Sequence, residues 1–170
     1  MVKVLIVDDA PDIVVLLAAQ LKGQGYEVLT ANSGREALEI AAAERPDVML
    51  LDVVMPGMDG FEVCRRLKAD ERLRMIQVIM VTAQDRDADV VKGLDSGAED
   101  YIAKPFSNAV LTARLRASLR LQHAYNAVAR VNEELRLEIA ERVQVEATLK
   151  KKVEELRQSQ KMEAVGVLAG

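Results

Sequence analysis

Five short apolar runs, separated by segments with helical spacing, organise the first part of the chain. The runs span residues 2–7, 28–31, 48–54, 78–81 and 101–103. Three of them are almost entirely valine, isoleucine, leucine and methionine, which is typical of strands buried on both faces. Apolar residues at helical spacing predict helices near 12–24, 34–44, 60–69 and 86–96, and from 107 onward. Five consecutive strand–helix units predict an α/β fold, in which helices cover both faces of a parallel sheet.

Local start and stop signals agree with these elements. Ser33 precedes the second helix and Glu36 lies three residues further on, which predicts a capping box. Gly97 follows the fourth helix, where a left-handed residue often ends one. The third apolar run is followed by MPGMDG at 55–60, and the proline and glycines of this segment predict a tight turn.

The second part of the chain has a different pattern. Residues 107–160 contain neither proline nor glycine, and a continuous helix over them would be roughly 80 Å long at about 1.5 Å per residue. Apolar residues recur mostly at spacings of three and four, as in a coiled-coil seam, at positions 121, 124, 128, 131, 135, 139, 149, 153 and 156. The two successive spacings of four after 131 predict a stutter.

This seam becomes unclear around residues 142–146, because Arg142 and Glu146 take the expected apolar positions. A chain of this size cannot cover so long a helix with its own residues. The pattern therefore favours a homodimer through the C-terminal helix, with the two helices parallel. The alternative is a solvated single helix.

Composition narrows the classes of function. A formal charge of −4 and a pI near 5.2 argue against a nucleic-acid surface, which needs a basic face. A single cysteine, Cys64, permits no internal disulfide and fits a reducing compartment. The start of the chain does not have the pattern of a signal peptide, and the apolar runs are too short to span a bilayer. We therefore expect a cytoplasmic protein without membrane insertion.

Three carboxylates lie at the carboxyl ends of predicted strands. Asp8 and Asp9 end the first strand, and Asp52 lies at the end of the third. In a doubly wound sheet these strands are neighbours at the switch point where ligands bind, so three negative charges converge in one crevice. A hard divalent cation relieves their repulsion, and magnesium suits a site with few protein ligands. The simpler alternative is that each aspartate only caps the helix after its strand.

Two further polar residues point to the same crevice. Thr82 ends the fourth strand, and Lys104 ends the fifth, just before Pro105. A carboxylate nucleophile, a metal site, a hydroxyl donor and a cation together are what phosphoryl transfer to a carboxylate needs. The alternatives are that Lys104 is only a salt-bridge partner of Asp52 and that Thr82 is only a β-branched strand residue.

These segments resemble the receiver domain of response regulators, the phosphoacceptor of two-component signalling. The resemblance covers residues 1–120 and rests on the segments VLIVDD at 4–9, LLDVVMPGMDGFE at 50–62, VIMVTA at 78–83 and SGAEDYIAKPF at 96–106. It implies a flavodoxin-like sheet with strand order 2-1-3-4-5. This family is a standard example of that doubly wound order, so the order follows from the resemblance and not from the sequence pattern.

The resemblance also implies roles for the acidic residues. Asp52 matches the aspartate that is phosphorylated, in a reaction that the domain catalyses on itself together with dephosphorylation. Asp8 and Asp9 match the acidic pair that holds Mg²⁺, Asp9 directly and Asp8 directly or through water. The backbone carbonyl of Val54 matches a further metal ligand.

The remaining site residues match the switch of the family. Thr82 matches the hydroxyl that bonds the phosphoryl group, and Tyr101 matches the aromatic residue that turns inward when Thr82 moves. Lys104 matches the family's lysine, and the Lys104–Pro105 peptide bond is expected to be cis. The phosphodonor implied is a histidine kinase or a phosphotransfer protein. Phosphorylation is then expected to alter the face made by the fourth and fifth helices.

Residues 135–170 are similar to the signalling helix that leads into histidine-kinase dimerisation domains. We therefore expect a receiver domain at 1–120 and a coiled-coil signalling helix at 121–170 that ends before a kinase output, whose activity would need residues beyond the chain. His123, in LRLQHAYNAV, does not resemble a kinase phosphorylation motif and is interpreted as a solvated or seam residue.

Other functions stay open. The chain could be a stand-alone phosphate sink, or a dimer scaffold that works without phosphorylation. A phosphatase with an aspartyl-phosphate intermediate would need a second acid two residues after the nucleophile, and that position is Val54.

Overall fold

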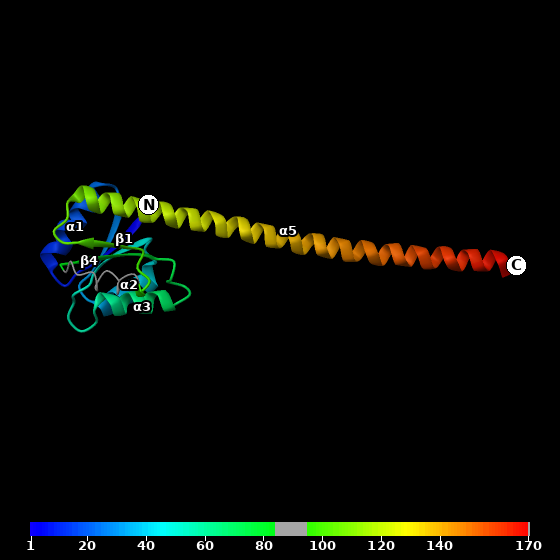
Figure 1. Cartoon of the computed structure of the whole chain (residues 1–170), viewed down its shortest axis with the longest axis horizontal. Helices are drawn as coiled ribbons and strands as arrows, with labels where there is room; N and C mark the ends of the chain where they lie inside the picture. The colour runs from blue at the N-terminus through cyan, green and yellow to red at the C-terminus, as the bar shows by residue number, and fades with distance from the viewer. Residues whose placement is uncertain (84–94, 170) are drawn as a thin grey trace. The chain divides into compact units, whose positions relative to one another are not determined.

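The computed structural model describes residues 1–83 and 95–169 (Figure 1). The chain divides into two compact units, Met1–His123 and Ala124–Gly170. The first unit contains the sheet, and the second is a length of helix.

The sheet has five parallel strands in the order β2-β1-β3-β4-β5, as the family resemblance implies. The strands are β1 Lys3–Val7, β2 Glu27–Ala31, β3 Val48–Asp52, β4 Gln77–Thr82 and β5 Asp100–Ala103. Each contains most of its predicted apolar run. The third apolar run continues to residue 54, and β3 ends at Asp52, where the strand was predicted to end.

Four described helices join or follow these strands. They are α1 Pro11–Gly23, α2 Gly34–Glu44, α3 Gly60–Ala69 and α5 Asn108–Ala169. Wherever the sequence predicted the first or last residue of one of these helices, the observed residue lies within one or two positions of it. The helix predicted near 86–96 lies almost entirely outside the described residues, as does the face it was expected to make with α5.

Two hydrophobic cores lie on opposite faces of the sheet. Successive strand residues point to opposite faces, so Leu5 and Met49 pack with α2 and α3, whereas Ile6 and Leu50 pack with α1 and the first turns of α5. Both cores are aliphatic, and burial of this apolar surface is the main favourable contribution to folding. The middle of β1, β3 and β4 is accordingly apolar and buried, and polar residues lie at or beside the strand ends.

The predicted cap of α2 is present, with one difference. The Ser33 hydroxyl accepts a hydrogen bond from the Glu36 amide at 3.3 Å, as a capping box requires. The Glu36 carboxylate, however, accepts from the amide of Asn32 at 2.7 Å and not from that of Ser33. The hydrogen bond to the Glu36 side chain therefore holds Asn32, the residue before the N-cap, and not the N-cap itself.

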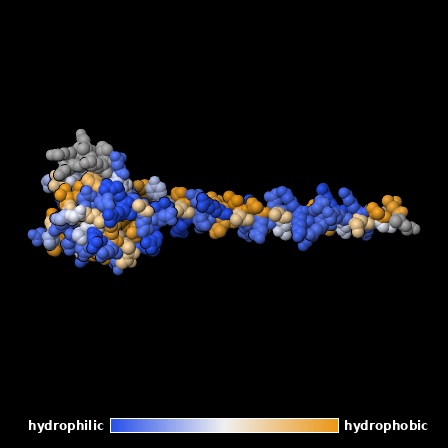
Figure 2. Space-filling view, turned by 90° about the horizontal axis from the view of Figure 1, so that it is seen from below, coloured by the Kyte–Doolittle hydropathy of each residue, from blue (hydrophilic) through white to orange (hydrophobic). Residues whose placement is uncertain are grey.

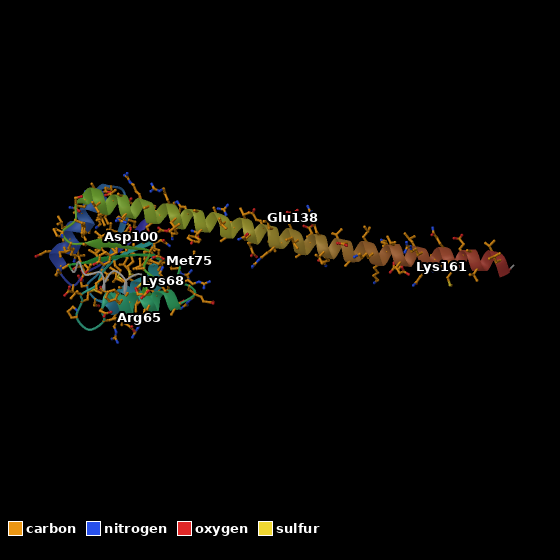
Figure 3. The ribbon with its side chains drawn as sticks, viewed as in Figure 1. Arg65, Lys68, Met75, Asp100, Glu138 and Lys161 are labelled. Carbon is orange, nitrogen blue, oxygen red and sulfur yellow. The ribbon has the colours of Figure 1, made fainter. Side chains whose placement is uncertain are left out.

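Lys68 of α3 holds the segment that leads into β5 (Figure 3). Its ammonium lies 2.5 Å from the Glu99 carboxylate and donates to the carbonyls of Arg74 and Ile76. The other oxygen of Glu99 accepts from the Val78 amide at 2.6 Å. This network fastens the start of β5 to β4, and so contributes to the position of the residues at the far end of β5.

The second unit is helical, and every side chain from Ala124 to Leu168 is exposed in the single chain. Exposed apolar residues include Val128, Leu135, Ile139, Leu149, Val153 and Leu156. Among the described helices, none combines the length and the apolar character that crossing a bilayer requires.

The two-core arrangement predicts the effect of truncating a central strand residue. Leu50 is 1% exposed and lies in the core beneath α1 and α5. We expect Leu50→Ala to lower the free energy of unfolding by about 2–5 kcal/mol, because it removes buried methyl groups and leaves a cavity. The measurement is urea denaturation, with Val15→Ala as the control. Val15 is 69% exposed, so its truncation should change stability by less than about 0.5 kcal/mol. Equal effects of the two substitutions would contradict this description of the core.

Candidate functional site

The Lys104 ammonium joins two buried carboxylates at the carboxyl edge of the sheet. It lies 2.7 Å from an oxygen of Asp8 and 2.7 Å from an oxygen of Asp52. Asp8 and Asp52 are 4% and 6% exposed, so neither charge is well solvated. The three residues follow or end three different strands, β1, β3 and β5, and they are separated by up to 96 positions in sequence.

The strand register explains why these side chains meet. Ile6, Leu50 and Ile102 lie two residues before Asp8, Asp52 and Lys104, and all three belong to the core beneath α1 and α5. Parallel strands bring their carboxyl ends to one edge, and the period of two brings these three positions to one side of it.

Burial and charge act in opposite directions on this cluster. Burial raises the pKa of Asp52, and the nearby Asp8 adds to that rise, whereas Lys104 and the Val54 amide only partly offset it. Burial alone would lower the pKa of Lys104, but its hydrogen bonds to Asp52 and Asp8 outweigh that effect and the pKa lies above its usual value. Lys104 therefore stays charged and neutralises part of the acidic cluster.

Backbone amides hold the two carboxylates in place. The second oxygen of Asp52 accepts from the Val54 amide at 3.1 Å, and that of Asp8 accepts from the Ala10 amide at 2.9 Å. Asp8 thus shapes the turn before α1, and it also binds Lys104. The salt bridge raised as an alternative for Lys104 is present. Neither Asp8 nor Asp52 caps a helix, because α1 has no side-chain cap and α3 is capped by Asp59.

Asp9 completes a group that could hold a metal ion. One oxygen from each of Asp8, Asp9 and Asp52 can be chosen so that all three lie within 4.8 Å of one another. Oxygen ligands about 2.1 Å from one Mg²⁺ lie up to about 4.2 Å apart, so this spacing is close to that of a shared ion. Asp9 is exposed, whereas the other two are buried, which leaves an open side for water or a phosphoryl group. The donor set, oxygen only and acidic, fits magnesium.

Thr82 and Tyr101 belong to the other face of the sheet. Thr82 is fully buried at the end of β4, two steps beyond Met80 of the core under α2 and α3. Tyr101 is half-buried and packs against that same core. The Thr82 carbonyl accepts from the Lys104 amide at 2.6 Å, which ties the end of β4 to the residue that binds both carboxylates. The Lys104–Pro105 peptide bond is cis.

Gly60 has a role that was not recognised from the sequence. The segment MPGMDG was predicted to form a tight turn, and in it Gly57 has a positive φ, at 80°, whereas Gly60 does not. Gly60 is instead required by close approach, because a Cβ there would collide with the Asp52 carbonyl oxygen and lie 3.0 Å from the Val53 Cα. Its amide donates to the Val53 carbonyl at 3.0 Å. The first residue of α3 is thus packed directly on the backbone of Asp52.

An apolar groove of about 310 Å³ begins at Lys104 and lies between α1 and the segment that leads into α5. We call it the α1 groove; it is lined by Ile13, Leu16, Leu17, Gln20, Lys104, Pro105, Phe106 and Asn108. Leu16 is 59% exposed, which is unusual for a leucine beside a charged site. In the sequence, Leu16 is one of the apolar residues that predict a helix near 12–24.

The other candidate residues lie apart from this cluster. Cys64 is buried in α3, where its thiol donates to the Ser96 carbonyl and burial raises the pKa of the thiol. It has the environment of a packed residue and not of a reactive one. His123 is exposed on α5. The Val54 amide is placed as described above, and the ligand role of its carbonyl stays a prediction.

Comparison with known proteins agrees with this geometry. The response regulator receiver domain family matches residues 4–116. The response regulator PleD of Caulobacter vibrioides is 48% identical over 120 residues, which are 71% of this chain and 26% of PleD. The alkaline phosphatase synthesis transcriptional regulatory protein PhoP of Bacillus subtilis is 47% identical over 118 residues, or 69% of this chain and 48% of PhoP. The chain thus spans about a quarter to a half of the length of these relatives.

Solved structures show the same similarity. The chemotaxis protein CheY4 of Vibrio cholerae superposes with a TM-score of 0.67 at 36% identity, covering 70% of this chain and 99% of that one. The signal receiver domain of a signal transduction histidine kinase from Syntrophus aciditrophicus superposes with a TM-score of 0.66 at 38% identity. The match covers 71% of this chain and 91% of that one.

The contact between Gly60 and Asp52 leads to a testable prediction. We expect Gly60→Ala to lower the free energy of unfolding by about 1–3 kcal/mol, because the added methyl group overlaps backbone atoms that cannot turn aside. Gly23→Ala is the matched control, since a Cβ at Gly23 would meet nothing within 4 Å. Urea denaturation of both variants checks this. If the two substitutions have the same effect, Gly60 is not packed on Asp52 as described.

Proposed function

The chain belongs to the response regulator receiver domain family, and on that premise we propose that Asp52 accepts a phosphoryl group in a magnesium-dependent reaction. Receiver domains take this group from histidine kinases or phosphotransfer proteins. The observation that carries the proposal is the placement of Lys104 between Asp8 and Asp52, with Asp9 beside them.

In the proposed reaction, a carboxylate oxygen of Asp52 attacks the phosphorus of the donor. A new O–P bond forms as the donor's bond to phosphorus breaks, and the leaving group keeps that electron pair. Lys104 stabilises the transferring group because its positive charge lies against the nucleophile and remains available to the phosphoryl oxygens. The Val54 amide orients the carboxylate through its hydrogen bond to the second oxygen.

Asp8, Asp9 and Asp52 would hold the magnesium ion, together with the predicted carbonyl of Val54. When bound, the ion neutralises charge on the carboxylates and on the incoming phosphoryl oxygens. Asp9 contributes from the exposed side and Asp8 from the buried side. Asp8 also positions Lys104, so it has two partners in the proposed site.

Thr82 and Tyr101 would report the phosphorylation to the rest of the domain. The Thr82 hydroxyl is proposed to bond the phosphoryl group, and Tyr101 to move further into the core under α2 and α3. Their location on one face of the sheet supports this pairing. Through the backbone bond from Lys104 to Thr82, the ends of β4 and β5 would shift together.

The second part of the proposal concerns output. The family match ends at residue 116, and α5 continues to Ala169 with exposed apolar residues along it. We assign residues 1–120 to the receiver and 121–170 to a helix that pairs with a second copy and transmits the switch to a kinase-like output. The exposed seam supports the homodimer, because apolar residues at such spacing are buried in coiled coils.

Phosphorylation of Asp52 can be tested by intact mass. We expect the wild type to gain one phosphoryl group on incubation with acetyl phosphate and magnesium, and Asp52→Asn to gain none. Asp12→Asn is the control, because Asp12 is exposed in the first turn of α1 and should not affect uptake. Uptake by Asp52→Asn would place the acceptor elsewhere. No uptake by the folded wild type would favour a scaffold that works without phosphorylation.

We expect a protein phosphodonor to dock on the α1 groove. Leu16→Asp introduces a charge into this apolar surface, so transfer from a protein donor should slow by at least about tenfold. Transfer from acetyl phosphate should be unchanged, because a small donor does not need the groove. Val15→Asp, on a neighbouring position that does not line the groove, is the matched control. If Leu16→Asp slows both donors equally, the substitution disturbs the site and not docking.

A further inference from the structure

The exposed seam of the second unit is interrupted by two charged residues. Val128, Leu135 and Ile139 precede the interruption, and Leu149, Val153 and Leu156 follow it. Counting three and then four from Ile139 leads to residues 142 and 146, and counting back from Leu149 leads to the same two positions. Arg142 and Glu146 therefore occupy consecutive seam positions in an unbroken heptad.

In the single chain, both residues have only exposed partners. Arg142 donates to Glu138 at 2.8 Å, one turn earlier (Figure 3), and Lys150 lies 3.0 Å from Glu146, one turn later. All four side chains are more than half exposed. Ion pairs of this kind contribute little to stability, so they can exchange for better partners at small cost.

Apolar residues flank the charged pair. Val143 and Val145 adjoin it on either side of the seam, and each is 61% exposed. Val145 and Leu149 also line a shallow groove of about 290 Å³ on this helix. Figure 2 shows apolar side chains gathered along the helix and a hydrophilic stretch between them. Two valines beside the pair would limit its access to water if the seam were covered, and so strengthen its electrostatic interactions.

We propose that the occupant of this seam is a second copy of the chain, and that Arg142 of each copy pairs with Glu146 of the partner subunit. This inference rests on the proposed homodimer and adds the residues that set its register. In a parallel, in-register pair the two charged layers are adjacent, so each arginine reaches the opposite carboxylate. A shift of one heptad would place Arg142 against Leu149 of the other copy and leave both charges without a partner across the dimer, which is unfavourable for charged groups in a seam.

The remaining layers favour the parallel orientation. In a parallel pair every apolar seam residue meets its own copy. In an antiparallel pair centred on the charged layers, Val128 would instead meet Gln160, because these residues are equally far from the centre. The charged pair alone is compatible with both orientations, so the apolar layers decide between them.

Mixing two variants isolates the contact between chains. Arg142→Glu carries two acidic residues at the seam, and Glu146→Arg carries two basic ones, so each alone should weaken self-association by at least about tenfold. An equimolar mixture should recover dimerisation to within about threefold of the wild-type Kd, because acidic and basic layers then face each other. Both charges within any one chain are alike, so recovery cannot come from pairing inside a helix. The readout is sedimentation equilibrium of the full chains.

Lys151→Glu with Glu155→Arg is the matched control pair. These substitutions change the net charge by the same amounts at positions that face away from the seam, so mixing should produce no gain. A mixture of the seam variants that associates no better than either one alone overturns the charged-layer contact. If the wild type is a monomer, the proposed homodimer is wrong. That outcome leaves the proposed phosphorylation of Asp52 unaffected.

A cysteine at a seam position tests the orientation. Leu149→Cys should cross-link to its own copy under oxidation in a parallel dimer, and the native Cys64 is buried and does not interfere. In an antiparallel dimer, Leu149→Cys would cross-link only when mixed with Ile139→Cys. That outcome would overturn the parallel register.

Discussion

One ammonium group between two buried carboxylates is the interaction around which the receiver unit is arranged. Asp8 and Asp52 are held at neighbouring strand ends, where their charges repel each other and burial disfavours both. The Lys104 ammonium offsets part of this unfavourable energy. Lys104 reaches both carboxylates because β5 ends at the same edge of the sheet. The three aspartates carry more negative charge than Lys104 offsets, and this excess favours binding of a cation.

The sheet also separates two tasks. Asp8, Asp52 and Lys104 follow strand positions that face α1 and α5, whereas Thr82 and Tyr101 follow positions on the face that packs against α2 and α3. In the proposed function, the residues that carry the chemistry and those that report it therefore come from strand positions on opposite faces of the sheet. The backbone hydrogen bond from Lys104 to Thr82 joins the ends of β5 and β4 and so offers a short route between them.

Much of this arrangement could be predicted from the sequence, because strands buried on both faces consist of nearly continuous apolar residues. Their polar ends then identify Asp8, Asp52, Thr82 and Lys104. The position of Gly60 on the Asp52 backbone could not be found in this way, since it depends on how two segments approach in space. The same is true of the return bond from Glu36 to Asn32 and of the pair between Lys68 and Glu99. The exposed side of Leu16 gave no local signal, because a leucine in an amphipathic helix is usually interpreted as core.

The central claim is that three aspartates form one cation site whose charge Lys104 only partly offsets. Calorimetric titration of the full chain with magnesium tests it most directly, using the wild type, Asp9→Asn and Asp12→Asn. The account predicts one ion per chain for the wild type and Asp12→Asn, and binding weakened by more than about tenfold for Asp9→Asn, which lacks the exposed ligand. Magnesium affinity that is unchanged in Asp9→Asn would contradict it, because the ion would then bind without the group on which the site is built.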